Sequence, residues 1–99
     1  MKELNQFKRL FWFIDPSRLD IRKDRNLIIH QVLAYGTLAD VKRLFKLYGK
    51  RTVKQEFQKP KKGLYQPSVL YFIQYLLGVN KINAKEYLKN IYEAPFRNP

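Results

Sequence analysis

The sequence predicts an all-α protein, a compact bundle of about five short helices in a single helical domain over residues 1–99. Apolar residues recur at spacings of three and four, and no stretch alternates apolar and polar residues as a strand would. Hydrophobic residues make up 45% of the chain and aromatic residues 15%, which is too much apolar surface for a disordered chain. Ninety-nine residues suffice for one modest core.

The first helix is predicted over residues 4–14, and Pro16 must end it. Its apolar face consists of Leu4, Phe7, Phe11 and Ile14. A turn follows in which carboxylates alternate with basic side chains. The carboxylates are those of Asp15, Asp20 and Asp24. Turn formation and helix capping explain them better than metal binding does.

The second helix is predicted over residues 25–35, with Asp24 or Asn26 as its N-terminal cap and Gly36 at its C-terminal end. Its apolar residues occupy two adjacent rows, as in a core helix. These residues are Ile28, Ile29, Val32, Leu33 and Tyr35.

A basic helical hairpin is predicted over residues 37–58. Thr37 and Asp40 approximate a capping box, so a helix begins there, and Gly49 ends it. About two further helical turns follow over residues 50–57. In the helix between Thr37 and Gly49, the residues expected on the buried side are Leu38, Val41, Leu44, Phe45 and Tyr48.

A basic loop over residues 59–66 leads to an apolar helix over residues 67–78, which begins at Pro67 and ends at Gly78. This helix is apolar nearly all the way round, so it is either central to the core or has a face left for a partner. The residues expected inside are Phe72, Ile73 and Leu76.

The last helix is predicted over residues 84–93, with Asn83 and Glu86 as its caps. Its apolar stripe consists of Ala84, Tyr87, Leu88 and Ile91, and Pro95 ends it.

Positive charge is high and concentrated. The chain has 20 Lys and Arg against 8 Asp and Glu, a formal net charge of +12. Such an excess indicates a polyanionic or acidic partner: DNA, RNA, an acidic protein or an anionic membrane. Residues 42–62 hold nine basic residues against a single acid, Glu56, so most of the excess lies there.

This charged hairpin has the outline of a helix-turn-helix, in which the second helix would enter the major groove. There Arg could bond guanine and Gln adenine, while the lysines would contact phosphates. The alternative is ordinary bundle packing with a solvated basic face. The candidate nucleic-acid-binding residues are Lys42, Arg43, Lys46, Lys50, Arg51, Lys54, Gln55, Lys61 and Lys62.

Tyr71 and Tyr75 are a second candidate site. They lie four residues apart on the apolar helix, on the side opposite Phe72, and such rings can stack on bases or anchor a protein interface. We favour the alternative that both rings pack inside with their hydroxyls at the surface, because so small a bundle needs aromatic volume. For binding to a protein, the candidate anchors are Trp12, Tyr71 and Tyr75.

No catalytic, metal or cofactor site is predicted. His30, the single histidine, lies among apolar residues of the second helix, where a packed imidazole is expected rather than a base or ligand. The absence of cysteine excludes thiolate chemistry, and no Gly-rich phosphate loop can be found. The protein is therefore expected to be non-enzymatic and to need no cofactor.

No targeting or membrane segment is expected. The apolar stretch of residues 10–14 is too short for a signal peptide, and that of residues 69–79 is too short to cross a bilayer. The absence of cysteine fits a reducing compartment, so a cytoplasmic location is expected.

The order of short motifs over residues 11–78 resembles an uncharacterised family of small prokaryotic proteins. The motifs are Phe-Trp, Asp-Pro, Leu-Asp, Ile-Ile, Val-Leu and Tyr-Gly, then an acidic residue, Leu and a second Tyr-Gly. The matching positions are Phe11, Trp12, Asp15, Pro16, Leu19, Asp20, Ile28, Ile29, Val32, Leu33, Tyr35, Gly36, Asp40, Leu44, Tyr48 and Gly49. Phe13 departs from the usual Asp of that family, and the stretch after the second Tyr-Gly is more basic.

Genes of that family often lie beside nucleotidyltransferase-type abortive-infection toxins. The resemblance therefore implies an antitoxin that neutralises a cognate toxin by direct contact, and it implies no catalytic residues. The basic face would meet an acidic toxin surface or the DNA of the operon. The alternative is a stand-alone nucleic-acid-binding module, for DNA or RNA, without a toxin partner. A neighbouring toxin gene would favour the first function.

Overall fold

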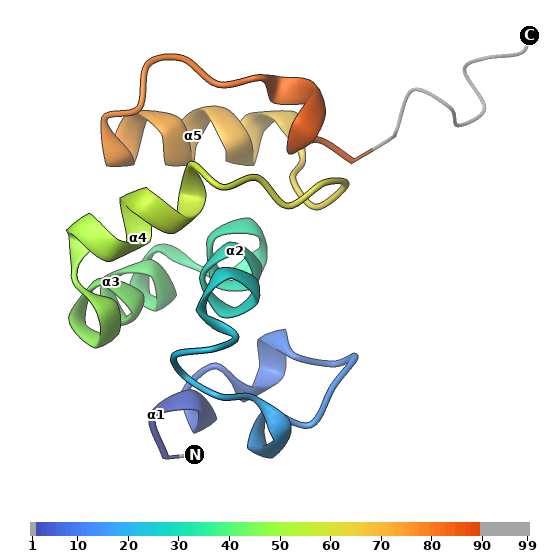
Figure 1. Cartoon of the computed structure of the whole chain (residues 1–99), viewed down its shortest axis with the longest axis vertical. Helices are drawn as coiled ribbons and strands as arrows, with labels where there is room; N and C mark the ends of the chain where they lie inside the picture. The colour runs from blue at the N-terminus through green and yellow to red at the C-terminus, as the bar shows by residue number, and fades with distance from the viewer. Residues whose placement is uncertain (1, 90–99) are drawn as a thin grey trace, which may run out of the picture.

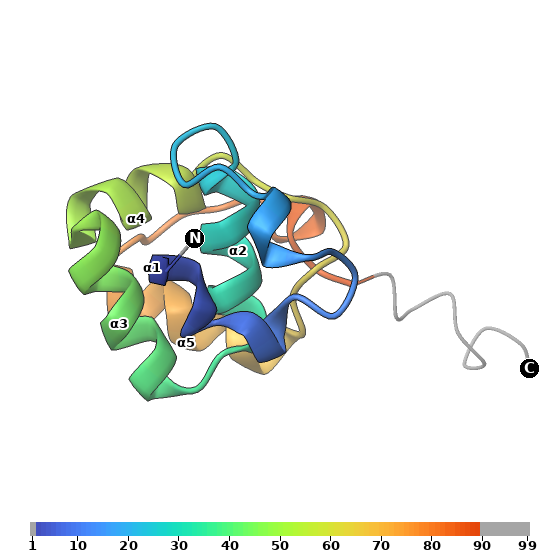
Figure 2. The same cartoon turned by 90° about the horizontal axis from the view of Figure 1, so that it is seen from below.

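Helix α2 (Arg25–Tyr35) lies at the centre of the structure, a computed structural model that describes residues 2–89. Its seven consecutive residues 28–34 are all buried. Figures 1 and 2 show the other elements arranged around this helix. The two apolar rows of α2 therefore face neighbours on several sides, as expected of a core helix.

Three more helices surround α2: α3 (Leu38–Tyr48), α4 (Lys50–Phe57) and α5 (Pro67–Leu77). The structure confirms the all-α class, and these helices begin and end where the sequence predicts. Gly49 alone joins α3 to α4, with a φ of +87° that favours glycine. Along the long axis in Figure 1, α5 lies at one end and α1 (Lys2–Asn5) at the other.

The capping residues predicted from the sequence are found at the ends of α3 and α5, which explains why these helix boundaries could be predicted. The capping box is present, because the Asp40 N–H donates to Thr37 Oγ1 (3.2 Å) and the Thr37 N–H donates to Asp40 Oδ2 (2.8 Å). Pro67 is the first residue of α5, and Gly78 follows it in the left-handed conformation.

Gly36 is the C-terminal cap of α2, as predicted, but the predicted N-terminal capping of this helix is wrong. Asp24 precedes the helix, but its carboxylate accepts from the N–H of Asp20 (2.7 Å) and not from the helix. Asn26 lies inside the helix and donates to Glu56. The aspartates instead shape the preceding turn, as the sequence indicated, since Asp20 Oδ1 accepts from two following N–H groups.

The N-terminal segment is not the single helix predicted over residues 4–14. Helix α1 is followed by two 3₁₀ turns, η1 (Lys8–Leu10) and η2 (Pro16–Arg18). Successive i to i+3 hydrogen bonds connect this segment, such as Phe7 N–H to the Leu4 carbonyl (2.9 Å). A 3₁₀ turn repeats every three residues, so it satisfies much of the apolar spacing that predicted an α-helix.

The predicted last helix is also shorter. A 3₁₀ turn, η3 (Ala84–Glu86), is capped by the Asn83 side chain, whereas Glu86 lies within the turn and does not cap it. The chain then runs beside Tyr65 in an isolated parallel bridge, and residues 2–89 contain no other strand-like pairing. Residues 90–93 of the predicted helix, with Ile91, lie outside the described residues.

A cluster of buried apolar side chains runs through the described elements, from Leu4 to Tyr87. Two expected members are missing from it. Leu38 is 51% exposed and Phe72 is 46% exposed. Leu38 is the first residue of α3, and Phe72 lies on a helix with more apolar surface than the core can cover.

Candidate nucleic-acid and partner-binding surfaces

Asp40 lies beneath the basic hairpin and not on its surface. Its side chain is fully buried and accepts hydrogen bonds from the Thr37 hydroxyl (3.1 Å) and from Arg43 (3.1 Å). Arg9, from the N-terminal segment, also pairs with it. The carboxylate therefore caps α3 and links it to the N-terminal turns.

The pKa of Asp40 reflects these partners. Burial of the carboxylate raises its pKa, but the hydrogen bonds from Thr37 and Arg9 outweigh burial and hold the pKa below its usual value. Asp40 is therefore charged at neutral pH, and its charge is directed to Arg9 and Arg43.

Glu56, the acid within the basic stretch, is buried in the same way. It accepts from Arg25 (2.7 Å), Asn26 (3.1 Å) and Lys59 (3.4 Å). Burial raises the pKa of Glu56, and these hydrogen bonds lower it by more, so the net shift is downward. Glu56 joins the N-terminal end of α2 to the end of α4.

Burial of both acids leaves the outer surface of the hairpin without an acidic side chain. We call this surface the α3–α4 basic face. It consists of the predicted residues Lys42, Lys46, Lys50, Arg51, Lys54 and Gln55, all exposed except the half-buried Lys54. None of the ion pairs found among the described residues involves these cations. Arg43 is exposed beside them but is paired with Asp40.

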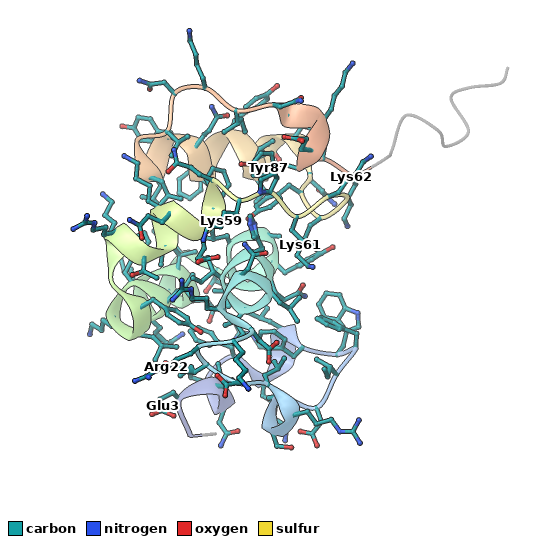
Figure 3. All side chains as sticks on the ribbon, in the orientation of Figure 1. Glu3, Arg22, Lys59, Lys61, Lys62 and Tyr87 are labelled. Carbon is teal, nitrogen blue, oxygen red and sulfur yellow. The ribbon has the colours of Figure 1, made fainter. Side chains whose placement is uncertain are left out.

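The structure does not bring the remaining two candidates to this face. Lys61 and Lys62 follow Lys59 along the loop after α4, and Figure 3 shows this loop running away from α3. They form a separate basic segment, so the structure gathers only part of the predicted set.

The tyrosines of α5 are exposed, which corrects the expectation that their rings pack inside. Tyr71 is 62% exposed and Tyr75 is 83% exposed. Phe72 and Ser68 are exposed on the same helix, each three residues from one of these tyrosines, so the prediction that Phe72 lies on the opposite side is wrong. We call these four residues the α5 aromatic surface.

A hollow of about 230 Å³ lies beside this surface, between α5 and the start of α3. Its walls include Leu38 and Val41 of α3 and Val69 and Phe72 of α5. The exposed Leu38 and Phe72 therefore line one apolar recess. An apolar side chain from another molecule could enter it.

Trp12 forms a separate aromatic patch. It is 65% exposed, and its ring packs edge-on against Tyr35 (5.1 Å between centroids) and Phe13 (5.9 Å). Trp12 belongs to the N-terminal segment, which lies at the other end of the molecule from α5 (Figure 1). The three predicted anchors are therefore exposed but do not form one surface.

His30 is part of the core. It is fully buried, and its Nε2 lies near the carbonyl oxygens of Glu56 (3.0 Å) and Lys59 (2.8 Å). Its Nδ1 lies 2.8 Å from the hydroxyl of Tyr65. Both ring nitrogens are thus occupied by structural partners, as expected of a packed imidazole.

No group of three or more His, Cys, Asp or Glu residues that could hold a metal occurs within residues 2–89. Among the helices described there, none is long and apolar enough to span a bilayer.

The sequence predicted that Leu38 and Phe72 are buried, whereas both are exposed. It did not predict that Asp40 and Glu56, the two acids of the hairpin, are buried. For the acids a signal existed. Glu56 shares a helical face with Val53 and Phe57, and Asp40 adjoins Val41 on the side facing the core. For Leu38 and Phe72 no local signal distinguishes an exposed apolar residue from a buried one.

Comparison with known proteins gives one result. Residues 6–57 match a protein family described as a family of unknown function (DUF6922). The match covers the N-terminal turns and helices α2 to α4, and so includes the α3–α4 basic face but not α5. Neither a curated protein nor a solved structure matches the chain.

Proposed function

We propose that this chain, which belongs to the DUF6922 family of unknown function, is a non-enzymatic, antitoxin-like protein that neutralises a cognate toxin by direct contact. The motif pattern, with its two Tyr-Gly pairs, supports the toxin partner through the resemblance noted above. A nucleotidyltransferase-type toxin is the proposed class. The structure supports a binding protein because it exposes a basic face on α3 and α4 and an aromatic surface on α5. The single histidine, in contrast, is hydrogen-bonded within the core.

The observation that carries this proposal is the α5 aromatic surface with its adjoining hollow. Large exposed rings grouped on one helix are unusual for a soluble monomer and are typical of protein interfaces. Residues 64–80 contain no charged residue, so this surface can be desolvated at little electrostatic cost.

The charges around the surface indicate the chemistry of the partner. Lys42 follows Leu38 by one helical turn, and Lys81 and Lys85 follow α5. A complementary toxin segment would insert apolar side chains into the hollow and place acidic side chains near these lysines. A second copy of this chain fits less well, because each copy carries a net charge of +12.

Co-expression with the toxin encoded beside its gene tests the proposal. The protein should restore growth, and a Phe72→Ser, Tyr75→Ser double variant should lose this protection. Because both residues are exposed, the variant should fold normally, and loss of two interface anchors should weaken the complex at least about tenfold. A Lys23→Ser, Gln58→Ser variant, changed at two exposed residues outside the surface, is the matched control. Full protection by the folded aromatic variant would place the interface elsewhere, with Trp12 the next candidate.

A stand-alone nucleic-acid-binding module is the second candidate, and the α3–α4 basic face favours it. That face presents five cations with no acid among them. This function would be favoured over the first if no toxin gene lies beside the gene of this protein and if the protein binds nucleic acid in a salt-dependent way.

A further inference from the structure

We infer that the α3–α4 basic face binds duplex nucleic acid through its backbone phosphates. This inference deepens the nucleic-acid candidate described above, on which it rests. It is carried by three observations: where the acids lie, how the cations are divided between two helices, and where the exposed rings are.

The first observation is the separation of charge by depth. Asp40 and Glu56 are the only acids of residues 37–62, and both are buried beneath the hairpin. Their negative charge is directed to Arg9, Arg25, Arg43 and Lys59. The outward cations consequently face solvent without acid neighbours on their own helices, which maximises the attraction for phosphates.

The second observation is the division of these cations between two helices that meet at Gly49. Lys42 and Lys46 belong to α3, while Lys50, Arg51 and Lys54 belong to α4. An α-helix with its side chains is about 10–12 Å across, so a short helix such as α4 can enter the ~12 Å major groove. Cations on two adjacent helices can therefore reach phosphates on both sides of a groove, which a single strand does not present.

The third observation is the absence of an exposed ring on α3 and α4. The aromatic residues of these helices that lie nearest the surface, Phe45 and Tyr48, are half-buried against the core. The Tyr48 hydroxyl donates to the Ile21 carbonyl (2.7 Å), so its polar tip is also engaged. Proteins that bind single strands stack bases on exposed rings between the cations, and this face offers none.

A titration by fluorescence anisotropy tests the inference. The probes are a mixed-sequence DNA duplex of about 24 base pairs and one of its strands alone, each at 50 and 200 mM NaCl. The variant is Lys50→Ala, Arg51→Ala, Lys54→Ala, and the matched control is Lys23→Ala, Lys81→Ala, Lys85→Ala, which removes the same charge from exposed positions elsewhere.

The wild-type protein should bind the duplex at least about tenfold more tightly than the single strand. Five phosphate contacts at a slope of about −0.9 each predict a loss of about 500-fold between the two salt concentrations. In the α4 variant the slope of log affinity against log salt should become shallower by about 2.7, whereas the control should leave it nearly unchanged.

The other outcomes overturn the inference in distinguishable ways. Equal or tighter binding of the single strand would contradict the duplex assignment while leaving a nucleic-acid function in place. Equal losses in the α4 variant and the control would show that net charge, and not this face, binds DNA. No binding to either probe at 50 mM NaCl would reject the nucleic-acid candidate altogether, and an acidic protein would then be the ligand of the face.

Discussion

The Nδ1 atom of His30 lies 2.8 Å from the hydroxyl oxygen of Tyr65, and both side chains are fully buried. The Nε2 atom faces two carbonyl oxygens, which can only accept hydrogen bonds, so Nε2 carries the proton. The neutral ring therefore accepts from Tyr65 at Nδ1. This arrangement connects α2 to the end of α4 and to the loop before α5.

Protonation of His30 should destabilise the fold. Burial lowers the pKa of His30 from its usual 6.5, and the carbonyl hydrogen bonds that raise it do not compensate. Below pH 6.5 the unfolded chain binds a proton that the folded chain does not. The free energy of unfolding should therefore fall as the pH drops from 6.5 toward the lower pKa of the folded state, by at most about 1.4 kcal/mol per pH unit, and be insensitive to this group above pH 7.

Because the chain has a single histidine, proton NMR can follow His30 directly. Its ring resonances should titrate below pH 6.5 in the folded protein, and urea unfolding should give the matching pH dependence. A titration midpoint at or above 6.5 would contradict the structural role assigned to the ring.

Removal of the Tyr65 hydroxyl should cost more than removal of an exposed one. Tyr65→Phe leaves the buried Nδ1 of His30 without a partner, which should lower the free energy of unfolding by about 1–3 kcal/mol. Tyr75→Phe, at an 83% exposed position, is the control and should change stability by less than about 0.5 kcal/mol. Urea unfolding at pH 7.5 measures both, and similar effects in the two variants would count against the hydrogen bond.

Glu56 should stabilise the junction between α2 and α4. Glu56→Ala removes the carboxylate that holds Arg25, Asn26 and Lys59. Arg25 and Lys59 are 48% and 66% exposed, so water can solvate them afterwards. We expect a loss of about 2 kcal/mol, less than the ~3–5 kcal/mol of a fully buried pair. Urea unfolding checks this value against Gln55→Ala, the neighbouring exposed residue, for which almost no change is expected.

The same carboxylate should give the stability profile an acid limb, which is a fall in the free energy of unfolding at low pH. The folded pKa of Glu56 lies below its ordinary 4.5, so the stability it contributes is present above pH 4.5 and is lost as the pH falls through the folded pKa. Glu56→Gln should flatten this limb without affecting the limb near pH 6 that belongs to His30. An unchanged acid limb in the Gln variant would assign it to other carboxylates.

Helix boundaries could be predicted from the sequence because they depend on local chemistry. Gly49, Pro67 and Gly78 and the Thr37–Asp40 box act on their own or adjacent backbone. Helices α3, α4 and α5 begin at these residues, and α3 and α5 also end at them. The N-terminal segment was predicted less well, since 3₁₀ turns and an α-helix can both place apolar residues three apart.

The candidate surfaces could be predicted only in part, for a physical reason. Which side of α5 is exposed depends on how much of an all-apolar helix its neighbours can cover, and that is decided by tertiary packing. The partners of the buried acids are also distant in sequence, as Arg9 is from Asp40 and Arg25 is from Glu56. The sequence therefore indicated the cations of the basic face but not the burial of its acids.

Gly36 should be intolerant of any side chain, although its φ of −80° is open to every residue. A Cβ atom there would lie 2.6 Å from the Val32 carbonyl oxygen and 2.9 Å from the Cβ of Asp40, which are main-chain and capping atoms that cannot move aside easily. Gly36→Ala should therefore lower the free energy of unfolding by about 2 kcal/mol through overpacking. Gly63→Ala is the control: its Cβ would meet no atom within 4 Å, and its positive φ alone should cost about 1 kcal/mol. If thermal and urea unfolding rank the two variants in the opposite order, α2 and α3 do not approach each other as closely at Gly36 as the structure shows.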